Sequence, residues 1–339
     1  MKALFIGGSG NISTPVSKLA IERGIELFHL NRGTRKVDIP GVKVLKGDIT
    51  KKEEVTAAIA GHDWDVVVNW IAFTREDILR DYELFKDSCK QYIFISSASA
   101  YQKPLTHPVI TESTPLKNPY WQYSRDKISC EETLDMLYRT EDFPMTIVRP
   151  SLTYDTVIPV AIGSWNDYTI IDRMKKGKPA IIHGDGSSLW TITHARDFAV
   201  GLVGLMGHQQ ALGQAFHITS DELLTWNQIY EAVANAAGVP LNAIHIASAF
   251  ISDAAKKMEW CSMGGDFMLG NLLGDKAVST IFDNTKIKTF VPEFNATTTF
   301  KKGIKETVEW FEADPARMVI HEENNRFMDA IIDAYQHIQ

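Results

Sequence analysis

A tyrosine and a lysine stand four residues apart at the start of a predicted helix, Tyr123–Tyr138. Four residues make about one helical turn, so the phenol of Tyr123 and the ammonium of Lys127 lie on the same face of that helix. A free tyrosine has a pKa of about 10 and is a poor base at neutral pH, but a nearby ammonium stabilises the phenolate. The pair is therefore typical of a site that exchanges a proton with an alcohol. The same spacing also arises by chance in many helices.

Serines follow a predicted buried strand, Tyr92–Ser96, in the run Phe-Ile-Ser-Ser-Ala-Ser-Ala-Tyr that ends at Tyr101. Ligands of parallel sheets bind at the carboxyl ends of the strands. A hydroxyl at this edge can polarise a carbonyl or hold a substrate alcohol during proton transfer. The candidates are Ser96, Ser97 and Ser99.

A glycine-rich loop comes directly after the first predicted strand, Lys2–Ile6, and reads Gly-Gly-Ser-Gly-Asn-Ile-Ser from Gly7. Gly7 permits a tight turn, and Gly10 lets the backbone approach a pyrophosphate at the N-terminus of the next helix. Ser13 occupies the position that usually holds a third glycine. A plain turn is the alternative, but the place of this loop between the first strand and the first helix favours a dinucleotide site.

A basic segment follows the second predicted strand, Glu26–Leu30. A cofactor without a 2′-phosphate usually meets an acidic residue here. This chain instead has Asn31 and Arg32, followed by Arg35 and Lys36. Positive charge at this position suits the 2′-phosphate of NADP, so we expect NADP to be favoured over NAD. A solvated basic loop is the alternative.

The first half of the chain alternates short apolar runs with helical patterns, which predicts an α/β fold with a Rossmann-type, doubly wound parallel sheet. Strands are predicted at Lys2–Ile6, Glu26–Leu30, Lys43–Lys46, Asp65–Asn69, Tyr92–Ser96 and Thr146–Arg149. Helices are predicted at Thr14–Arg23, Lys52–Ala60, Glu76–Cys89 and Tyr123–Tyr138.

The pattern changes after Pro150, where glycine and proline become frequent. We expect a dinucleotide-binding Rossmann domain over residues 1–155. Residues 190–222 are expected to return to it through a helix, Ala195–Met206, and a strand, Ala215–Ile218. A smaller, interleaved substrate domain with C-terminal helices is expected over residues 156–189 and 223–339.

The composition describes a soluble protein of 339 residues with 45% hydrophobic residues and a formal charge of −7. That charge weighs against nucleic acid as the main partner. Three widely spaced cysteines and a short apolar N-terminus favour the cytoplasm, and no apolar run is long enough for a membrane span. The ten histidines lack metal-ligand spacing, so we expect no metal.

Taken in order, these motifs resemble those of the extended short-chain dehydrogenases/reductases, the family of nucleotide-sugar epimerases and dehydratases. The resemblance covers residues 1–310 and also includes Gly47-Asp48-Ile49 and Arg149-Pro150. Among the serines, Ser97 lies four residues before Tyr101 and so matches the family's spacing. The resemblance implies the following roles: Asp48 and Ile49 at the adenine, Asn11 and Ile12 at the phosphates, Ala72, Pro150 and Ser151 near the nicotinamide, and Ser97, Tyr123 and Lys127 in catalysis. Relatives are often homodimers, which makes a homodimer the family-level expectation.

Three departures from the family pattern narrow the chemistry. Ala98-Ser99 stands where sugar-nucleotide dehydratases carry an Asp-Glu pair, which makes a dehydratase improbable. Trp190 replaces an arginine that binds the substrate diphosphate, and an indole cannot supply that planar fork. Trp190 is expected either to stack on a substrate ring or to belong to the core. Ile71 is bulkier than the alanine usual beside the nicotinamide.

The stretches Phe216–Glu222 and Phe282–Lys288 are similar to the branch that includes chloroplast stem-loop-binding proteins, which are reported to bind or cut RNA. Those proteins generally lack the tyrosine of the Y-x-x-x-K motif, whereas this chain keeps both Tyr123 and Lys127. We therefore expect hydride transfer at a secondary alcohol or ketone of a sugar-like or nucleotide-sugar substrate. Net oxidation or reduction and epimerisation through a transient ketone both remain open. The alternatives are an RNA-binding protein and a non-catalytic NADP sensor.

Overall fold

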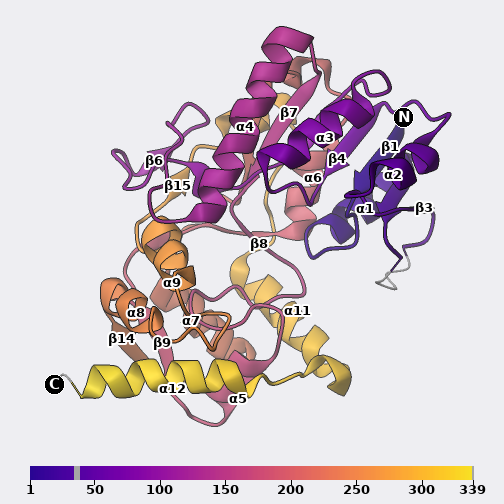
Figure 1. Cartoon of the computed structure of the whole chain (residues 1–339). Coiled ribbons are helices and arrows are strands. Elements are labelled where there is room, and N and C mark those ends of the chain that lie inside the picture. The colour runs from indigo at the N-terminus through magenta and orange to yellow at the C-terminus, as the bar shows by residue number, and fades with distance from the viewer. Residues whose placement is uncertain (34–38, 338–339) are drawn as a thin grey trace.

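The computed structural model describes residues 1–33 and 39–337 (Figure 1). Within them a seven-stranded sheet runs in the order β3-β2-β1-β4-β5-β7-β12, and every neighbouring pair is parallel. These strands are β1 (Lys2–Ile6), β2 (Glu26–Asn31), β3 (Lys43–Lys46), β4 (Val66–Asn69), β5 (Tyr92–Ile95), β7 (Met145–Pro150) and β12 (Gln214–Ile218). The order reverses at β1, so the predicted Rossmann-type, doubly wound sheet is confirmed.

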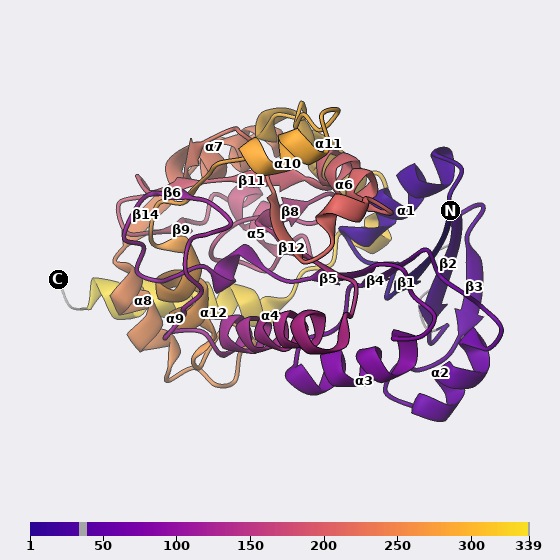
Figure 2. The same cartoon turned by 90° about the horizontal axis from the view of Figure 1, so that it is seen from above.

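The central strands are apolar on both faces because helices cover both. Ala3 and Phe5 of β1 pack against one layer, and Leu4 and Ile6 pack against the other. Figure 2 shows the two layers on opposite sides of the sheet. The first contains α1 (Ser13–Glu22) and α6 (Ala195–Leu205), and the second contains α2 (Lys52–Ile59), α3 (Arg75–Phe85) and α4 (Gln122–Glu141).

Two predicted helix ends were wrong. The α3 helix ends at Phe85 rather than at Cys89, because the chain turns there and straightens. Cys89 then forms a parallel bridge with Trp64, which leads into the sheet. The α4 helix continues past Tyr138 to Glu141, where Asp142 takes a left-handed conformation with φ of 52° and ends it.

The second part of the molecule lies beside the carboxyl edge of the sheet (Figure 1). Its own core includes Ile181, Trp226, Tyr230, Phe311 and Phe327. The strands are short and paired: β8 (Leu152–Tyr154) with β11 (Ile192–His194), β9 (Ala180–His183) with β14 (Ala243–Ile246), β10 (Leu189–Trp190) with β13 (Leu224–Thr225), and β6 (Val109–Ile110) with β15 (Ile281–Phe282). The helices are α5 (Thr169–Lys175), α7 (Trp226–Ala236), α8 (Ser248–Ala255), α9 (Phe267–Asn271), α11 (Phe300–Glu312) and α12 (Glu322–Gln336).

The chain crosses between the two parts more than once. The strand β12 completes the sheet beside β7. Later, α10 (Thr285–Phe290) and the residues after it return to the sheet, where Ile287, Val291 and Phe294 pack in the same core as α6. The sequence assigned these residues to the smaller domain. In the described ranges, none of the helices combines the length and the apolar character that a membrane span requires.

Candidate active site

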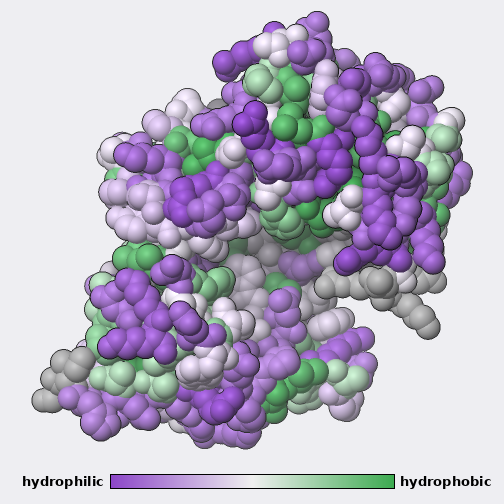
Figure 3. Space-filling view, in the orientation of Figure 1, coloured by the Kyte–Doolittle hydropathy of each residue, from purple (hydrophilic) through white to green (hydrophobic). Residues whose placement is uncertain are grey.

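Two adjoining cavities lie at the carboxyl edge of the sheet, where the molecule is hollowed between its two parts (Figure 3). We name the first the glycine-loop cavity. It measures about 710 Å³ and is lined by Gly7, Gly10 and Arg32, among others. We name the second the tryptophan cavity; it measures about 550 Å³ and is lined by Trp121, Trp165 and Trp190. Both are lined by the predicted site residues Ile12, Tyr123 and Pro150, so the two spaces meet there.

The glycine loop is shaped by close approaches of its backbone. Gly7 has a φ of +84°, a conformation that favours glycine. A Cβ at Gly8 would lie 2.5 Å from the buried ring of His29. A Cβ at Gly10 would meet only Ser13 Oγ, at 3.4 Å. No protein neighbour therefore excludes a side chain at position 10. Glycine there leaves room on the cavity side.

Ser13, at the position of the usual third glycine, closes the loop. Its hydroxyl accepts a hydrogen bond from the Gly10 amide at 2.7 Å and donates to the carbonyl of Gly7 at 3.4 Å. The helix α1 begins at the same residue, so its first amides face the loop. Such a helix N-terminus favours an anionic group, which fits the pyrophosphate of a dinucleotide.

The side-chain amide of Asn11 forms hydrogen bonds within the protein. It donates to the carbonyl of Thr153 at 3.1 Å and accepts from the amides of Asp155 and Thr156 at 3.0 and 3.2 Å. Asn11 thus ties the loop to the segment after β8. The phosphate contact that the family resemblance implies for Asn11 would come from its backbone or from the second N–H of its side-chain amide.

The outer end of the glycine-loop cavity is formed by Asn31, Arg32, Asp48 and Ile49, as predicted from the sequence. Asn31 accepts a hydrogen bond from the Gly33 amide at 2.9 Å, and Arg32 is exposed. Hydrogen bonds from Thr50 lower the pKa of Asp48, and the nearby Arg32 lowers it further. Arg35 and Lys36, the other predicted cations, lie outside the described residues.

Lys127 is almost completely buried, with 1% of its surface exposed. Its ammonium donates to the carbonyls of Ala72 at 2.7 Å and Ile95 at 2.9 Å, which lie just after β4 and at the end of β5. It also lies 4.4 Å from the centre of the Phe73 ring. An ammonium has three N–H groups, so one donor remains for the glycine-loop cavity that Lys127 lines.

Tyr123 lies in the first turn of α4, at the junction of the two cavities. Burial raises the pKa of Tyr123, and a hydrogen bond with Ser97 lowers it in part. Burial lowers the pKa of Lys127 to about 8. The expectation that Lys127 brings down the pKa of Tyr123 was wrong for the protein alone, because burial dominates and the ammonium is directed at two carbonyls.

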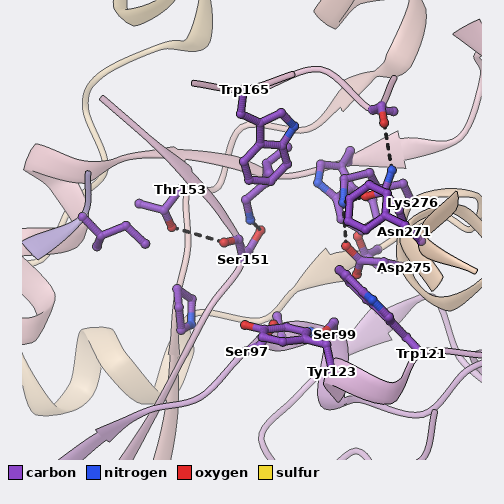
Figure 4. A pocket seen from close by; sticks show the side chains of 18 of the residues that line it. Ser97, Ser99, Trp121, Tyr123, Ser151, Thr153, Trp165, Asn271, Asp275 and Lys276 are labelled. Atoms are coloured by element: carbon purple, nitrogen blue, oxygen red, sulfur yellow. Dashed lines mark hydrogen bonds and ion pairs between the residues drawn. The ribbon is translucent and has the colours of Figure 1, made fainter. Parts of the chain in front are cut away.

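The three candidate serines have different partners, which separates their roles. Ser97 lies close to Tyr123 in the tryptophan cavity (Figure 4). Ser99 bonds with the hydroxyls of Ser97 at 2.9 Å and Ser124 at 2.8 Å. Ser96 donates to Glu131 at 2.5 Å. Ser97 is thus the serine placed to hold a substrate oxygen beside Tyr123.

A buried ion pair beneath the site was missed in the sequence. Glu131 receives hydrogen bonds from Arg149, the closest at 2.6 Å, and Arg149 also donates to the hydroxyl of Tyr101 at 3.1 Å. Glu131 lies four residues after Lys127, which is one helical turn further along the same face as Tyr123 and Lys127. This spacing is the signal in the sequence that could have identified Glu131. The pair fixes α4 against β7 and, through Ser96, fixes the end of β5.

Trp190 both lines the tryptophan cavity and belongs to the core. It is 3% exposed, and its ring lies 5.6 Å from that of Trp226. Ser151, predicted near the nicotinamide, also lines this cavity and donates to the carbonyl of Thr191 at 2.7 Å. The expectation that Trp190 belongs to the core is therefore confirmed, and its stacking on a substrate ring stays a prediction.

A polar group on the wall beyond Trp121 was not anticipated from the sequence. Lys276 donates to Asn271 at 2.7 Å and to Asp275 at 3.0 Å, and Figure 4 shows Trp121 between this group and Tyr123. Lys103 lines the same cavity. Across residues 1–33 and 39–337, no group of three or more histidine, cysteine or carboxylate side chains is arranged to hold a metal ion.

Comparisons with known proteins agree with this geometry. The chain is 24% identical over 261 residues to 2'-dehydrokanamycin reductase of Streptomyces kanamyceticus, covering 77% of this chain and 73% of that protein. It is 24% identical over 253 residues to the chloroplast stem-loop binding protein of 41 kDa b of Arabidopsis thaliana, covering 70% of this chain and 64% of that protein.

The fold is also similar to that of a solved UDP-glucuronic acid 4-epimerase from Bacillus cereus in complex with UDP-glucuronic acid and NAD. The TM-score is 0.70 at 17% identity, and the match covers 92% of this chain and 99% of that one. A sequence profile described as the NAD dependent epimerase/dehydratase family matches residues 3–219. This match covers more than half of the sequence, and the chain belongs to the NAD dependent epimerase/dehydratase family.

Proposed function

We propose that the protein is an NADP-dependent oxidoreductase or epimerase that transfers hydride at a secondary alcohol or ketone of a sugar-like substrate. The observation that carries this proposal is the position of Tyr123 and Ser97. Tyr123 lines both cavities, and Ser97 lies close to it in the tryptophan cavity (Figure 4). A cofactor in one cavity and a substrate in the other would therefore meet at these two hydroxyls.

The glycine-loop cavity fits a dinucleotide. It extends from Arg32 past the glycine loop to Tyr123, and the first turn of α1 faces it. Bound NADP would accept or supply the hydride at C4 of its nicotinamide. In the protein, Tyr123 would exchange the alcohol proton, Ser97 would hold the substrate oxygen, and Lys127 would hold the ribose with its remaining N–H.

The preference for NADP over NAD rests on Arg32. The position that usually carries an acidic residue holds Asn31, and the exposed guanidinium of Arg32 follows it at the outer end of the cavity. A guanidinium binds phosphate through paired hydrogen bonds. Titration calorimetry should give a lower Kd for NADP than for NAD, and equal values would contradict the preference.

A net reduction is favoured over epimerisation by the relative from Streptomyces kanamyceticus, which is named a reductase. The test has two parts. Nicotinamide absorbance is followed while the protein and NADP(H) are mixed with a panel of sugars and keto sugars. Mass spectrometry then identifies any nucleotide released from the denatured protein. Turnover of NADPH with a keto sugar supports the reductase, and a retained dinucleotide with no net turnover supports the epimerase.

RNA binding is the second candidate, because the chain is similar to a protein named a chloroplast stem-loop binding protein. The net charge of −7 and the paired Tyr123 and Lys127 argue against it. Contacts with RNA phosphates cause affinity to fall steeply as salt rises. A filter-binding assay that finds tight, steeply salt-dependent RNA binding would put this candidate first.

We also propose a homodimer that uses α4. Met136 and Tyr138 on this helix are 41% and 39% exposed, and α4 packs beside α3 within the chain. Large apolar side chains that are exposed on one helix are commonly covered by a partner. Sedimentation velocity should give the mass of two chains, and replacing both side chains with glutamate should give the mass of one.

A further inference from the structure

The tryptophan cavity contains more positive than negative charge. Among the described residues, the charged side chains that line it are Lys103, Asp275 and Lys276. Asp275 and Lys276 form an ion pair at 3.0 Å, and Asn271 accepts a second hydrogen bond from Lys276. Asp275 therefore compensates the positive charge of Lys276. The positive charge of Lys103 has no second carboxylate among the described residues of the cavity wall to compensate it.

Lys103 is buried without a close partner. It is 1% exposed, and over residues 1–33 and 39–337 no hydrogen bond joins its ammonium to another residue. Burial lowers the pKa of Lys103, Asp275 raises it in part, and Lys276 lowers it. Burying an ammonium without a partner is costly, so an uncompensated lysine in a cavity wall indicates that a ligand completes its surroundings.

The two lysines flank the residue at which this chain departs from the family. The ammonium groups of Lys103 and Lys276 each lie 5.9 Å from the centre of the Trp190 ring. Trp190 stands where relatives carry an arginine. The positive charge that is missing from position 190 is thus present beside it, supplied by two other segments of the chain.

The surrounding walls are flat aromatic rings. Lys276 lies 5.8 Å from the ring of Trp121 and 5.4 Å from that of Trp165. Trp121 in turn lies 5.0 Å from Tyr123 (Figure 4). A ring-shaped substrate that packs against these tryptophans would therefore reach from the acid–base tyrosine to the two lysines.

We propose that the substrate carries an anionic substituent, a carboxylate or a phosphate, that binds to Lys103 beside Trp190. Its reacting alcohol or ketone lies at Ser97 and Tyr123, so this inference rests on the proposed function for the reaction itself. Lys276, already paired with Asp275, adds positive charge near the same ring. The same charge disfavours a substrate that carries ammonium groups.

The test uses NADP-saturated protein and titration calorimetry with four probes: glucuronate, inorganic phosphate, glucose and glucosamine. Glucuronate and phosphate represent the two sources of the anion. At least one of them should bind more tightly than glucose by about tenfold or more, as expected of a charge-assisted hydrogen bond, and glucosamine should bind least. If neither anion binds more tightly than glucose, the proposal is wrong.

Three variants assign the effect to the residue. Lys103→Met keeps the length of the side chain and should abolish the preference for the anion, whereas Lys103→Arg should keep it. Lys301→Met removes an exposed lysine from α11 and is the matched control. Lys103→Met should also raise the Tm, because it removes an uncompensated buried charge. A lower Tm together with unchanged anion affinity would show that Lys103 is structural.

The outcome is independent of turnover. Tyr123→Phe should keep the preference for glucuronate over glucose, because the hydroxyl it removes would contact a sugar alcohol that both probes share. If Tyr123→Phe keeps full turnover while Lys103→Met loses the preference for the anionic probe, the hydride-transfer proposal fails and the anion site stands. If the anion preference is absent while Tyr123→Phe is inactive, the hydride-transfer proposal stands and the anion site fails.

Discussion

The two cavities that meet at Tyr123 are built in different ways. The glycine-loop cavity is lined by segments that directly follow consecutive sheet strands, such as Gly7 after β1, Arg32 after β2 and Asp48 after β3. The tryptophan cavity is lined by side chains from connections that are far apart in the sequence, from Lys103 to Lys276. The sheet geometry fixes the first cavity, whereas the packing of long connections fixes the second.

This difference determines which amino-acid substitutions each cavity tolerates. One wall of the glycine-loop cavity is the glycine loop, which is held by the close approach of Gly8 to His29 and by the bonds of Ser13 and Asn11. The walls of the tryptophan cavity are large side chains and buried charges. A side chain can change without moving the sheet, so the tryptophan cavity is where members of one family can differ in substrate while they keep the cofactor site.

The largest expected effect is at the junction of the two cavities. Under the proposed function, Tyr123→Phe removes the hydroxyl assigned to exchange the alcohol proton, so kcat should fall by about 10²–10⁴-fold or more. Affinity for NADP should change little, and stability should change by about 1.5 kcal/mol or less. Stopped-flow absorbance with the substrate found in the panel measures the rate.

Tyr120→Phe is the control for this change, since Tyr120 precedes the same helix but lines neither cavity. Its kcat should equal that of the wild type. If Tyr123→Phe keeps more than about a tenth of wild-type turnover, the hydroxyl is not the acid–base group.

The sequence predicted the central sheet and most of the glycine-loop cavity because both depend on local patterns. The core strands are continuous apolar runs, and Gly7, Asn31 and Gly47 each follow a predicted strand directly, with Asp48 next after Gly47. The approach of Gly8 to His29 was missed, although pairing of β1 with β2 places Phe5 opposite His29 and so brings the two near each other.

The tryptophan cavity could not be predicted in the same way. The strands near it, such as β10 and β13, have two residues each and leave no periodic pattern. Lys103 is a single lysine in a connection and Lys276 ends a short π-helix, Leu272–Lys276, and the sequence suggests exposed surface for both. Only the packing of distant segments makes them buried, so their role depends on tertiary structure.

A pair of glycine substitutions separates folding from binding in the glycine-loop cavity. Gly8→Ala forces a methyl group against the buried ring of His29 and should lower the free energy of unfolding by about 1–3 kcal/mol. Gly10→Ala meets only Ser13 Oγ, at 3.4 Å, and should leave stability nearly unchanged while it weakens NADP binding. Urea unfolding and calorimetry measure the two effects. Equal losses of stability would contradict the difference between the two glycines.

A smaller effect is expected at the outer end of the same cavity. Arg32→Ala should weaken NADP binding by about tenfold, the loss expected for one charge-assisted phosphate contact, and leave NAD binding unchanged. The difference in NADP affinity between the wild type and Arg32→Ala should become smaller as the salt concentration rises, because Arg32 is exposed. Lys52→Ala, an exposed cation outside the cavity, is the control. An equal loss for both cofactors would place Arg32 away from the 2′-phosphate.

The last prediction is a stability effect at Lys127, whose ammonium donates to two carbonyls, in contrast to that of Lys103. Burial lowers the pKa of Lys127 from 10.5 to about 8. Between these two values the unfolded chain binds a proton that the folded chain has released, so rising pH favours the folded state. The stability of the wild type relative to Lys127→Met should therefore increase from pH 8 to pH 10.5, by at most about 1.4 kcal/mol per pH unit. Urea unfolding across this range, with Lys301→Met as an exposed control, measures the slope. Parallel pH dependence in the wild type and Lys127→Met would mean that this lysine keeps its proton in the fold, held by its carbonyl partners.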